Sequence, residues 1–181
     1  MAAFQDHGDA QRFRVEVEDE ERLAAFWLKV APAKTRVLPF DGTVLLRPGR
    51  PTTRPQSFTF LGFTHFLTKT REGKLNIGRT PSRISRERFL RRAADWLRAN
   101  RHLPVSDQQR HLGRALVGYD QYFGLRLCLD ALKRVRYRTR RLWYRSLRRR
   151  SQKAKRTCDW ATLNAKPWFQ LPLPRVVHAW V

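Results

Sequence analysis

One stretch of the sequence limits what this chain can fold into more than any other: residues 133–156 contain 13 Lys and Arg and no Asp or Glu. Apolar and small side chains recur there with helical spacing over about residues 127–150. They are Leu132, Val135, Thr139, Leu142, Trp143 and Ser146. Arginines recur on the opposite side: Arg134, Arg138, Arg141, Arg145 and Arg148. A helix with this pattern must bury one side and expose a continuous row of guanidinium groups.

The overall charge indicates what would face those guanidinium groups. The formal net charge is +23, and arginine outnumbers lysine 30 to 8. A chain this basic repels itself unless a polyanion neutralises it. Arginine forks onto phosphate through two hydrogen bonds and stacks on bases, whereas lysine acts as a point charge. Nucleic acid is therefore the expected partner.

Composition also excludes several classes of protein. A hydrophobic fraction of 41% suffices for a folded core, so wholesale disorder is not expected. No window approaches 18 uninterrupted apolar residues, and the first residues lack the segments of a secretory signal. We therefore expect a cytoplasmic protein without a membrane partner. The two cysteines, Cys128 and Cys158, are too few for a four-thiolate zinc site.

The charge is unevenly distributed along the chain. Residues 1–22 have seven acids and three bases, a net charge of −4, whereas the remaining residues have 35 bases and eight acids, a net charge of +27. A polyanion is thus expected against the second half of the chain. The residues expected to contact it are Arg134, Arg138, Arg141, Arg145, Arg148, Arg149 and Lys153.

The first third of the chain mixes one helical pattern with irregular segments. Apolar spacing predicts an amphipathic helix over residues 9–27. Short extended segments follow, and then a Pro- and Gly-rich loop over residues 41–57 that carries Arg47, Arg50 and Arg54.

Alternating aromatic residues then predict a strand over residues 57–67 with a bend at Gly62. A turn at residues 71–74 leads into a returning strand at 75–78. The fold class expected from the whole pattern is α+β: a helix with antiparallel strands, followed by three helices.

Three helical segments make up the second half of the chain. The first is predicted over about residues 86–99 and the second from a capping box at Ser106-x-x-Gln109 to Phe123. The arginine-rich helix over 127–150 is the third. Residues 157–181 are expected to be extended and to pack back on the helices.

The residues themselves offer no catalytic site. Two-metal enzymes need converging carboxylates, but the acids after residue 22 are isolated from one another in the sequence. The five histidines lack any metal-ligand spacing, and no nucleophile or phosphate-loop motif is present. No catalytic residue, metal ligand or cofactor is assigned.

An ordered set of short motifs resembles the reverse transcriptases encoded by group II introns. The segments that carry the resemblance are Pro32–Arg36, Phe58–His65, Trp96–Arg98, Gly118–Gly124, Arg148–Gln152 and Leu173–His178. The first two are similar to the end of the polymerase palm and its primer-grip hairpin. The primer-grip-like residues are Phe60, Leu61, Gly62 and Phe63. The later segments resemble the family's three-helix thumb, also called domain X or the maturase-specific domain.

The resemblance implies a division into a palm remnant, residues 1–80, and a thumb with its C-terminal tail, residues 81–181. In the family, the catalytic YADD motif would stand immediately before Phe4, so the chain would be a C-terminal part without the carboxylates that hold Mg²⁺. Lys34 would then be only a remnant of a palm motif. Trp27 and Ala33 depart from the residues usual in the family.

The function implied is RNA binding: contact with intron RNA that assists splicing, and a grip on an RNA–DNA duplex. Polymerisation by this chain alone is not expected. Two alternatives stay open. The chain could complete a separately encoded N-terminal reverse transcriptase half, or it could be a basic structural protein unrelated to introns. Four tyrosines, Tyr119, Tyr122, Tyr137 and Tyr144, could stack on unpaired bases or belong to the core.

Overall fold

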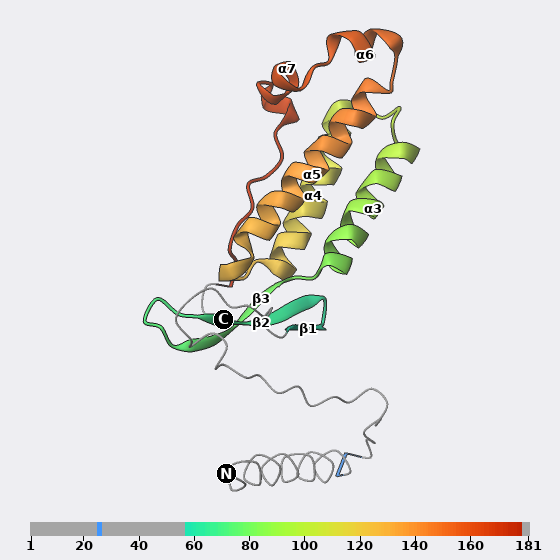
Figure 1. The fold of residues 1–181 in the computed structure, drawn as a ribbon. Coiled ribbons are helices and arrows are strands. Elements are labelled where there is room, and N and C mark those ends of the chain that lie inside the picture. The colour runs from blue at the N-terminus through green and yellow to red at the C-terminus, as the bar shows by residue number, and fades with distance from the viewer. Residues whose placement is uncertain (1–24, 27–56, 179–181) are drawn as a thin grey trace, which may run out of the picture. The chain divides into compact units, whose positions relative to one another are not determined.

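The computed structural model describes residues 25–26 and 57–178, which contain a three-stranded antiparallel sheet and a set of helices (Figure 1). This is the α+β fold class expected from the sequence. Ala25 and Phe26 form a turn where the sequence predicts helix. The rest of that predicted helix, Lys34 and the arginine-bearing loop over residues 41–56 lie outside the described residues.

A tight hairpin begins the described sheet. Strand β1 (Ser57–Phe60) pairs with β2 (Phe63–Lys69), with Phe60 opposite Phe63. Between them Leu61 and Gly62 both have positive φ angles, 47° and 80°. Two successive residues in this region make a turn that reverses the chain. The prediction of one bent strand over residues 57–67 is therefore wrong, because the bend at Gly62 is a complete reversal.

The second turn of the sheet agrees with the sequence. Strand β3 (Leu75–Pro81) pairs with β2, and Gly73 occupies the turn with a φ of 79°. The turn is closed by hydrogen bonds from the Gly73 N–H to the Thr70 carbonyl and from the Thr70 N–H to the Lys74 carbonyl. β3 runs three residues beyond the predicted end at 78 and leads directly into the first long helix.

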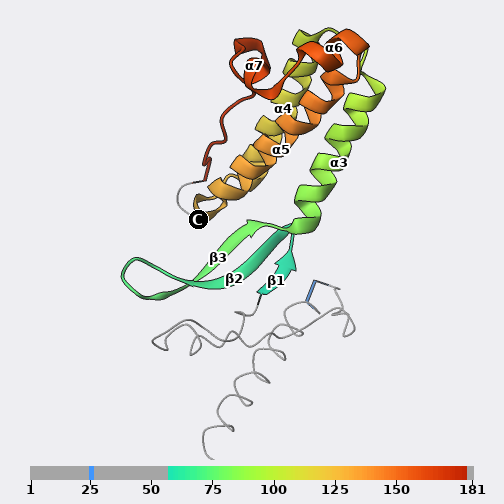
Figure 2. The same cartoon turned by 45° about the horizontal axis from the view of Figure 1, so that its top comes forward.

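Three long helices follow: α3 (Arg83–Ala99), α4 (Val105–Phe123) and α5 (Leu129–Arg148). α3 begins earlier than expected because Ser82 caps it, accepting the Ser85 N–H at 3.1 Å. A 3₁₀ turn, η1 (Arg126–Cys128), precedes α5. The three helices lie side by side, with the sheet at one end of them in both views (Figure 1, Figure 2).

The predicted capping box at the start of α4 is wrong. The residue before the helix is Pro104, and no side chain caps the helix there. Since Pro104 already marks the boundary, Ser106 falls inside the first turn. Gln109 donates instead to the Gln170 carbonyl at 2.9 Å and so holds the C-terminal segment.

The C-terminal segment is only partly extended. It contains α6 (Gln152–Thr157), α7 (Trp160–Asn164) and the 3₁₀ turn η2 (Pro167–Phe169), none of which the sequence predicts. From Gln170 to His178 the chain is largely extended and returns along the helices, as expected. It is tied there by Arg136, which donates to the Leu171 and Pro172 carbonyls, and by two backbone bonds to the Gly124 carbonyl.

The sheet and the helices belong together. The described residues from Ser57 to His178 all belong to one compact unit. Phe63 packs on Phe123 with ring centroids 4.9 Å apart, and the Tyr122 hydroxyl donates to the Leu61 carbonyl at 2.9 Å. Among the described residues, no helix combines the length and the apolar character needed to span a membrane.

The core of the three helices is built on the side of α5 that the sequence predicts. Leu132, Val135, Thr139, Trp143 and Ser146 are buried, and Leu142 is half-buried. A polar residue lies at the centre of this core: Gln108 of α4 is fully buried. Its amide oxygen accepts the Trp143 indole N–H at 2.8 Å, and its amide nitrogen donates to the Asn100 carbonyl at 2.9 Å.

Replacing Gln108 is expected to destabilise the whole helical bundle. The change Gln108→Leu leaves the buried Trp143 N–H without an acceptor and removes the amide donor from the carbonyls of the α3–α4 loop, which costs about 2–4 kcal/mol. Urea denaturation followed by tryptophan fluorescence measures this free energy of unfolding. Gln109→Leu is the matched control: it removes one bond to the tail and should cost at most about 1 kcal/mol. Equal stability of Gln108→Leu and the unmodified protein would contradict the assignment.

Candidate nucleic-acid interface

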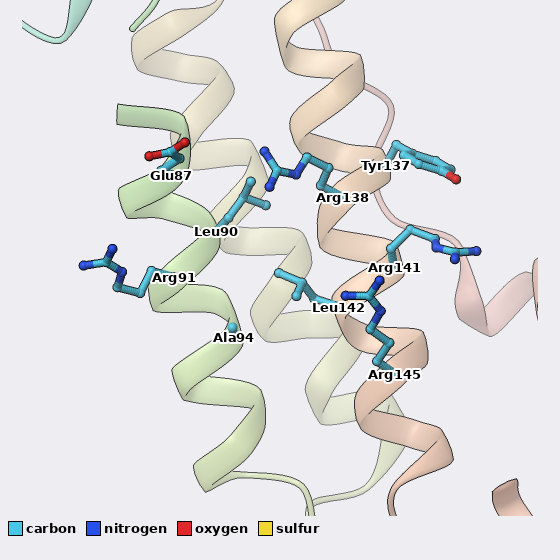
Figure 3. Close-up of a pocket in the computed structure, with 9 residues that line it drawn as sticks. All are labelled: Glu87, Leu90, Arg91, Ala94, Tyr137, Arg138, Arg141, Leu142 and Arg145. Atoms are coloured by element: carbon cyan, nitrogen blue, oxygen red, sulfur yellow. The ribbon is translucent and has the colours of Figure 1, made fainter. Parts of the chain in front are cut away.

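A groove of about 490 Å³ runs between α3 and α5 (Figure 3). Its floor is apolar, because Leu90 of α3 and Leu142 of α5 point toward one another between the two helices. Charged and polar side chains surround this floor. The nine lining residues are Glu87, Leu90, Arg91, Ala94, Tyr137, Arg138, Arg141, Leu142 and Arg145. Four of the nine are arginines, and they come from both helices.

Two of the groove arginines on α5 are free to bind a ligand. Arg138 and Arg145 are exposed, and neither makes a hydrogen bond or an ion pair with the residues that the structure describes. Figure 3 shows Arg138 extending from α5 toward α3. Exposed guanidinium groups without internal partners keep all their N–H donors available for phosphate oxygens.

Two further arginines of the predicted row are held in place by aromatic rings. The Arg141 guanidinium lies 4.8 Å from the centroid of Trp160 and 5.7 Å from that of Tyr144. Arg148 lies 5.6 Å from the Tyr144 ring and donates to the Lys155 carbonyl at 3.1 Å. Cation–π contacts of this kind fix a guanidinium while leaving donors on its rim exposed. From Arg138 to Arg148 the row therefore alternates free and fixed arginines.

One acid lines the groove. Glu87 accepts a hydrogen bond from Arg83 at 2.8 Å, and the two form an ion pair one helical turn apart. This hydrogen bond, together with the charges of Arg83, Arg138 and Arg91, lowers the pKa of the Glu87 carboxyl. The carboxylate is thus ionised at neutral pH and opposes anion binding at its end of the groove.

The remaining residues of the predicted set lie elsewhere on the same part of the chain. Arg149 lines a second cleft beside the end of α5, and Arg148 lines it too. Arg134 is exposed on α5, and Lys153 is exposed on α6; neither lines the groove between α3 and α5 or the cleft at the end of α5.

The sequence reasoning missed the contribution of α3. Arg91 lines the groove and Arg98 a smaller depression next to it. Their separation of seven residues places them on one face of α3, which is a signal available in the sequence. This spacing does not stand out in the sequence, because α3 carries arginines on more than one side.

Not every arginine of α5 belongs to the interface. Arg140 is only 7% exposed, lies 5.0 Å from the centroid of Phe169 and donates to the Asn164 side chain at 2.7 Å. Burial lowers the pKa of this guanidinium, with a smaller contribution from Arg136. Arg140 therefore fastens α7 and η2 to α5.

The primer-grip-like residues form the tip of the first hairpin. Phe60 and Leu61 are exposed, Gly62 has a positive φ, and Phe63 packs against Tyr122 with centroids 5.6 Å apart. Of the four tyrosines considered for base stacking, Tyr119 and Tyr144 are buried, whereas Tyr122 and Tyr137 are each 53% exposed. Only the last two can offer a ring face to a base.

The described residues contain no group of three or more His, Cys, Asp or Glu side chains able to hold a metal ion. Cys128 is buried and Cys158 half-buried, and both are free thiols.

Comparison with protein-family models, with curated proteins and with solved structures finds no match to this chain.

The distinction between fastening and free arginines predicts different effects on stability. Arg140→Ala removes the cation–π contacts and the bond to Asn164, so it should lower the free energy of unfolding by about 1–3 kcal/mol. Arg138→Ala, two residues earlier on the exposed side, should change it by less than about 0.5 kcal/mol. Urea denaturation of the two variants checks this. Similar losses in both would contradict the assignment of Arg140 as a structural residue.

Proposed function

We propose that the groove between α3 and α5 binds the phosphate backbone of RNA, and that the chain acts as the thumb of a group II intron reverse transcriptase or maturase. On this proposal the partner is the intron RNA or an RNA–DNA duplex, and the chain assists splicing or holds the template and primer. Its contribution is binding. The single observation that carries the RNA-binding part is the set of four arginines, from two helices, that line one groove.

The dimensions support a backbone contact. From Arg134 to Arg148 the row spans about 21 Å at a rise of about 1.5 Å per residue. Arginines spaced along α5 in this way can neutralise successive phosphates of a nucleic-acid backbone, since each phosphate carries one charge. The alternation of free and fixed side chains supports it as well, because fixed guanidinium groups lose little conformational entropy on binding.

The exposed tyrosines favour RNA with unpaired bases as the ligand. Tyr137 lines the groove itself, and Tyr122 lies at the hairpin. Aromatic rings stack on splayed-out bases, which are abundant in the loops and bulges of a folded intron and absent from regular duplex DNA. A backbone grip beside such rings is suited to a structured RNA.

Binding of a folded intron RNA to the full chain tests the proposal. The double variant Arg138→Ala/Arg145→Ala should weaken binding by about 10–100-fold and reduce the slope of log affinity against log salt by about 1.5–2. The matched control is Lys69→Ala/Lys74→Ala, which removes two charges from the β2–β3 hairpin, away from the groove. It should change the affinity by less than about threefold.

Competition identifies the class of nucleic acid. An excess of duplex DNA should fail to displace the folded RNA if the function is maturase-like. Displacement by equal amounts of duplex DNA would instead indicate a basic structural protein without preference for intron RNA. An equal loss of affinity in the groove and hairpin double variants would show that binding is diffuse and would overturn the assignment of the groove.

Replacing the acid in the groove provides a test in which RNA affinity should increase. Glu87→Gln removes the charge that opposes phosphate and releases Arg83 from its ion pair. RNA affinity should therefore rise by about two- to fivefold at 0.1 M salt. Glu72→Gln, which removes an equivalent charge from the turn before β3, is the control and should leave the affinity nearly unchanged. Fluorescence anisotropy with labelled RNA measures both, and an unchanged or weaker affinity in Glu87→Gln would count against binding in the groove.

A further inference from the structure

A second cleft, of about 790 Å³, lies where the α3–α4 loop, the end of α5 and the start of α6 meet. Five of its seven lining residues are cationic and none is acidic. The seven are Arg101, Arg145, Arg148, Arg149, Ser151, Gln152 and Lys155. The cleft adjoins the groove, because Arg145 lines both.

The charges in this cleft are arranged differently from those along the groove. Along α5 the arginines follow one another at about one per helical turn. In the cleft, Arg101 comes from the α3–α4 loop and Lys155 from α6, and both face the three arginines at the end of α5. Five cations around one space repel one another unless a compact anion of high charge lies between them.

Two buried donors in the cleft lack acceptors. The Nε atoms of Arg101 and Arg148 are buried and have no hydrogen-bond partner among the described residues. Buried N–H groups are almost always paired, so the guanidinium groups of Arg101 and Arg148, two residues that line the cleft, keep donor capacity for a ligand. The Ser151 hydroxyl accepts the Ala154 N–H at 3.0 Å, which leaves its proton available for donation to the same ligand.

We infer that this cleft binds a polyphosphate group, two or three phosphates joined by anhydride bonds. A single phosphodiester carries one negative charge and would leave most of these cations unneutralised, whereas a triphosphate carries about four. The group could come from the 5′ end of an unprocessed RNA or from a free triphosphate. The 5′-end source rests on the proposed function, because that RNA would continue into the groove through Arg145.

Two RNAs of identical sequence, one with a 5′-triphosphate and one with a 5′-hydroxyl, test the inference on the full chain. Both carry a label at the 3′ end, and fluorescence anisotropy gives the ratio of their dissociation constants. The triphosphate RNA should bind about tenfold or more tightly. Arg101→Gln/Lys155→Gln should reduce this ratio to about one while leaving the affinity for the 5′-hydroxyl RNA nearly unchanged.

A matched variant separates this inference from the proposed function. Arg134→Gln/Arg138→Gln removes two charges from the other end of the row and should weaken binding of both RNAs while keeping their ratio. If the ratio of dissociation constants falls to about one only in the cleft variant, the assignment of the cleft is supported. Equal affinity of the unmodified chain for both RNAs overturns the 5′-end source. Lys155→Gln alone, on the exposed side of α6, serves as the cleft variant if replacing Arg101 impairs folding.

Calorimetry with inorganic tripolyphosphate distinguishes the two sources. Saturable binding of tripolyphosphate that Lys155→Gln weakens, together with equal affinities for the two RNAs, assigns the cleft to a free polyphosphate. Competition of tripolyphosphate with the triphosphate RNA alone, and not with the 5′-hydroxyl RNA, assigns it to the RNA end. Absence of tripolyphosphate binding together with equal RNA affinities refutes the inference altogether.

Discussion

The hydrogen bond between the Gln108 amide and the Trp143 indole is the interaction on which the helical bundle depends. Gln108 belongs to α4, Trp143 to α5, and the amide nitrogen of Gln108 reaches the carbonyl of Asn100, just beyond the end of α3. One buried side chain thereby joins all three helices. Because such an amide in a dry core must satisfy every donor and acceptor, it fixes the spacing of α3 and α5 more narrowly than apolar contacts alone.

This core must also offset the repulsion between α3 and α5. Arginines from both helices line the same groove, and the ion pairs among the described residues are local and exposed, like the Arg83–Glu87 pair and the 3.3 Å pair of Arg98 with Asp95. Exposed pairs of this kind contribute little to stability. Burial of Leu90, Leu97 and Trp143 therefore has to hold two like-charged surfaces together. A polyanion in the groove would relieve that repulsion, so its binding would stabilise the fold.

The sequence was most informative where one periodicity ran without interruption. On α5 a spacing of 3.6 residues predicted the buried side and also the exposed residues Arg134, Arg138 and Arg145. The two sets lie on opposite sides of the helix, so one periodicity assigned both. Prediction from the sequence failed where a polar residue is buried. Gln108 and Arg140 look like surface residues in the sequence, and only their partners, Trp143 and Asn164, explain their burial. The clefts could not be predicted, since they require the relative placement of α3, α5 and α6.

The first hairpin shows how a local preference can be overridden by tertiary contacts. Leu61 holds a φ of 47°, where a non-glycine residue costs about 1–2 kcal/mol, and its exposed side chain gains no packing in return. The turn persists because its backbone is bonded from outside. The Tyr122 hydroxyl donates to the Leu61 carbonyl, and the Gly62 carbonyl accepts both the Ser82 N–H at 2.8 Å and the Ser85 hydroxyl at 3.0 Å.

These bonds have a consequence for the hairpin as a whole. Ser82 and Ser85 stand at the start of α3, and Tyr122 stands at the end of α4, so the turn is fastened to two helices at once. A Cβ atom at Gly62 would lie 2.9 Å from the Ser85 hydroxyl oxygen, which leaves no room for a larger residue there. The contacts that hold the strained turn in place therefore also fix the position of the exposed Phe60 and Leu61 relative to α3 and α4.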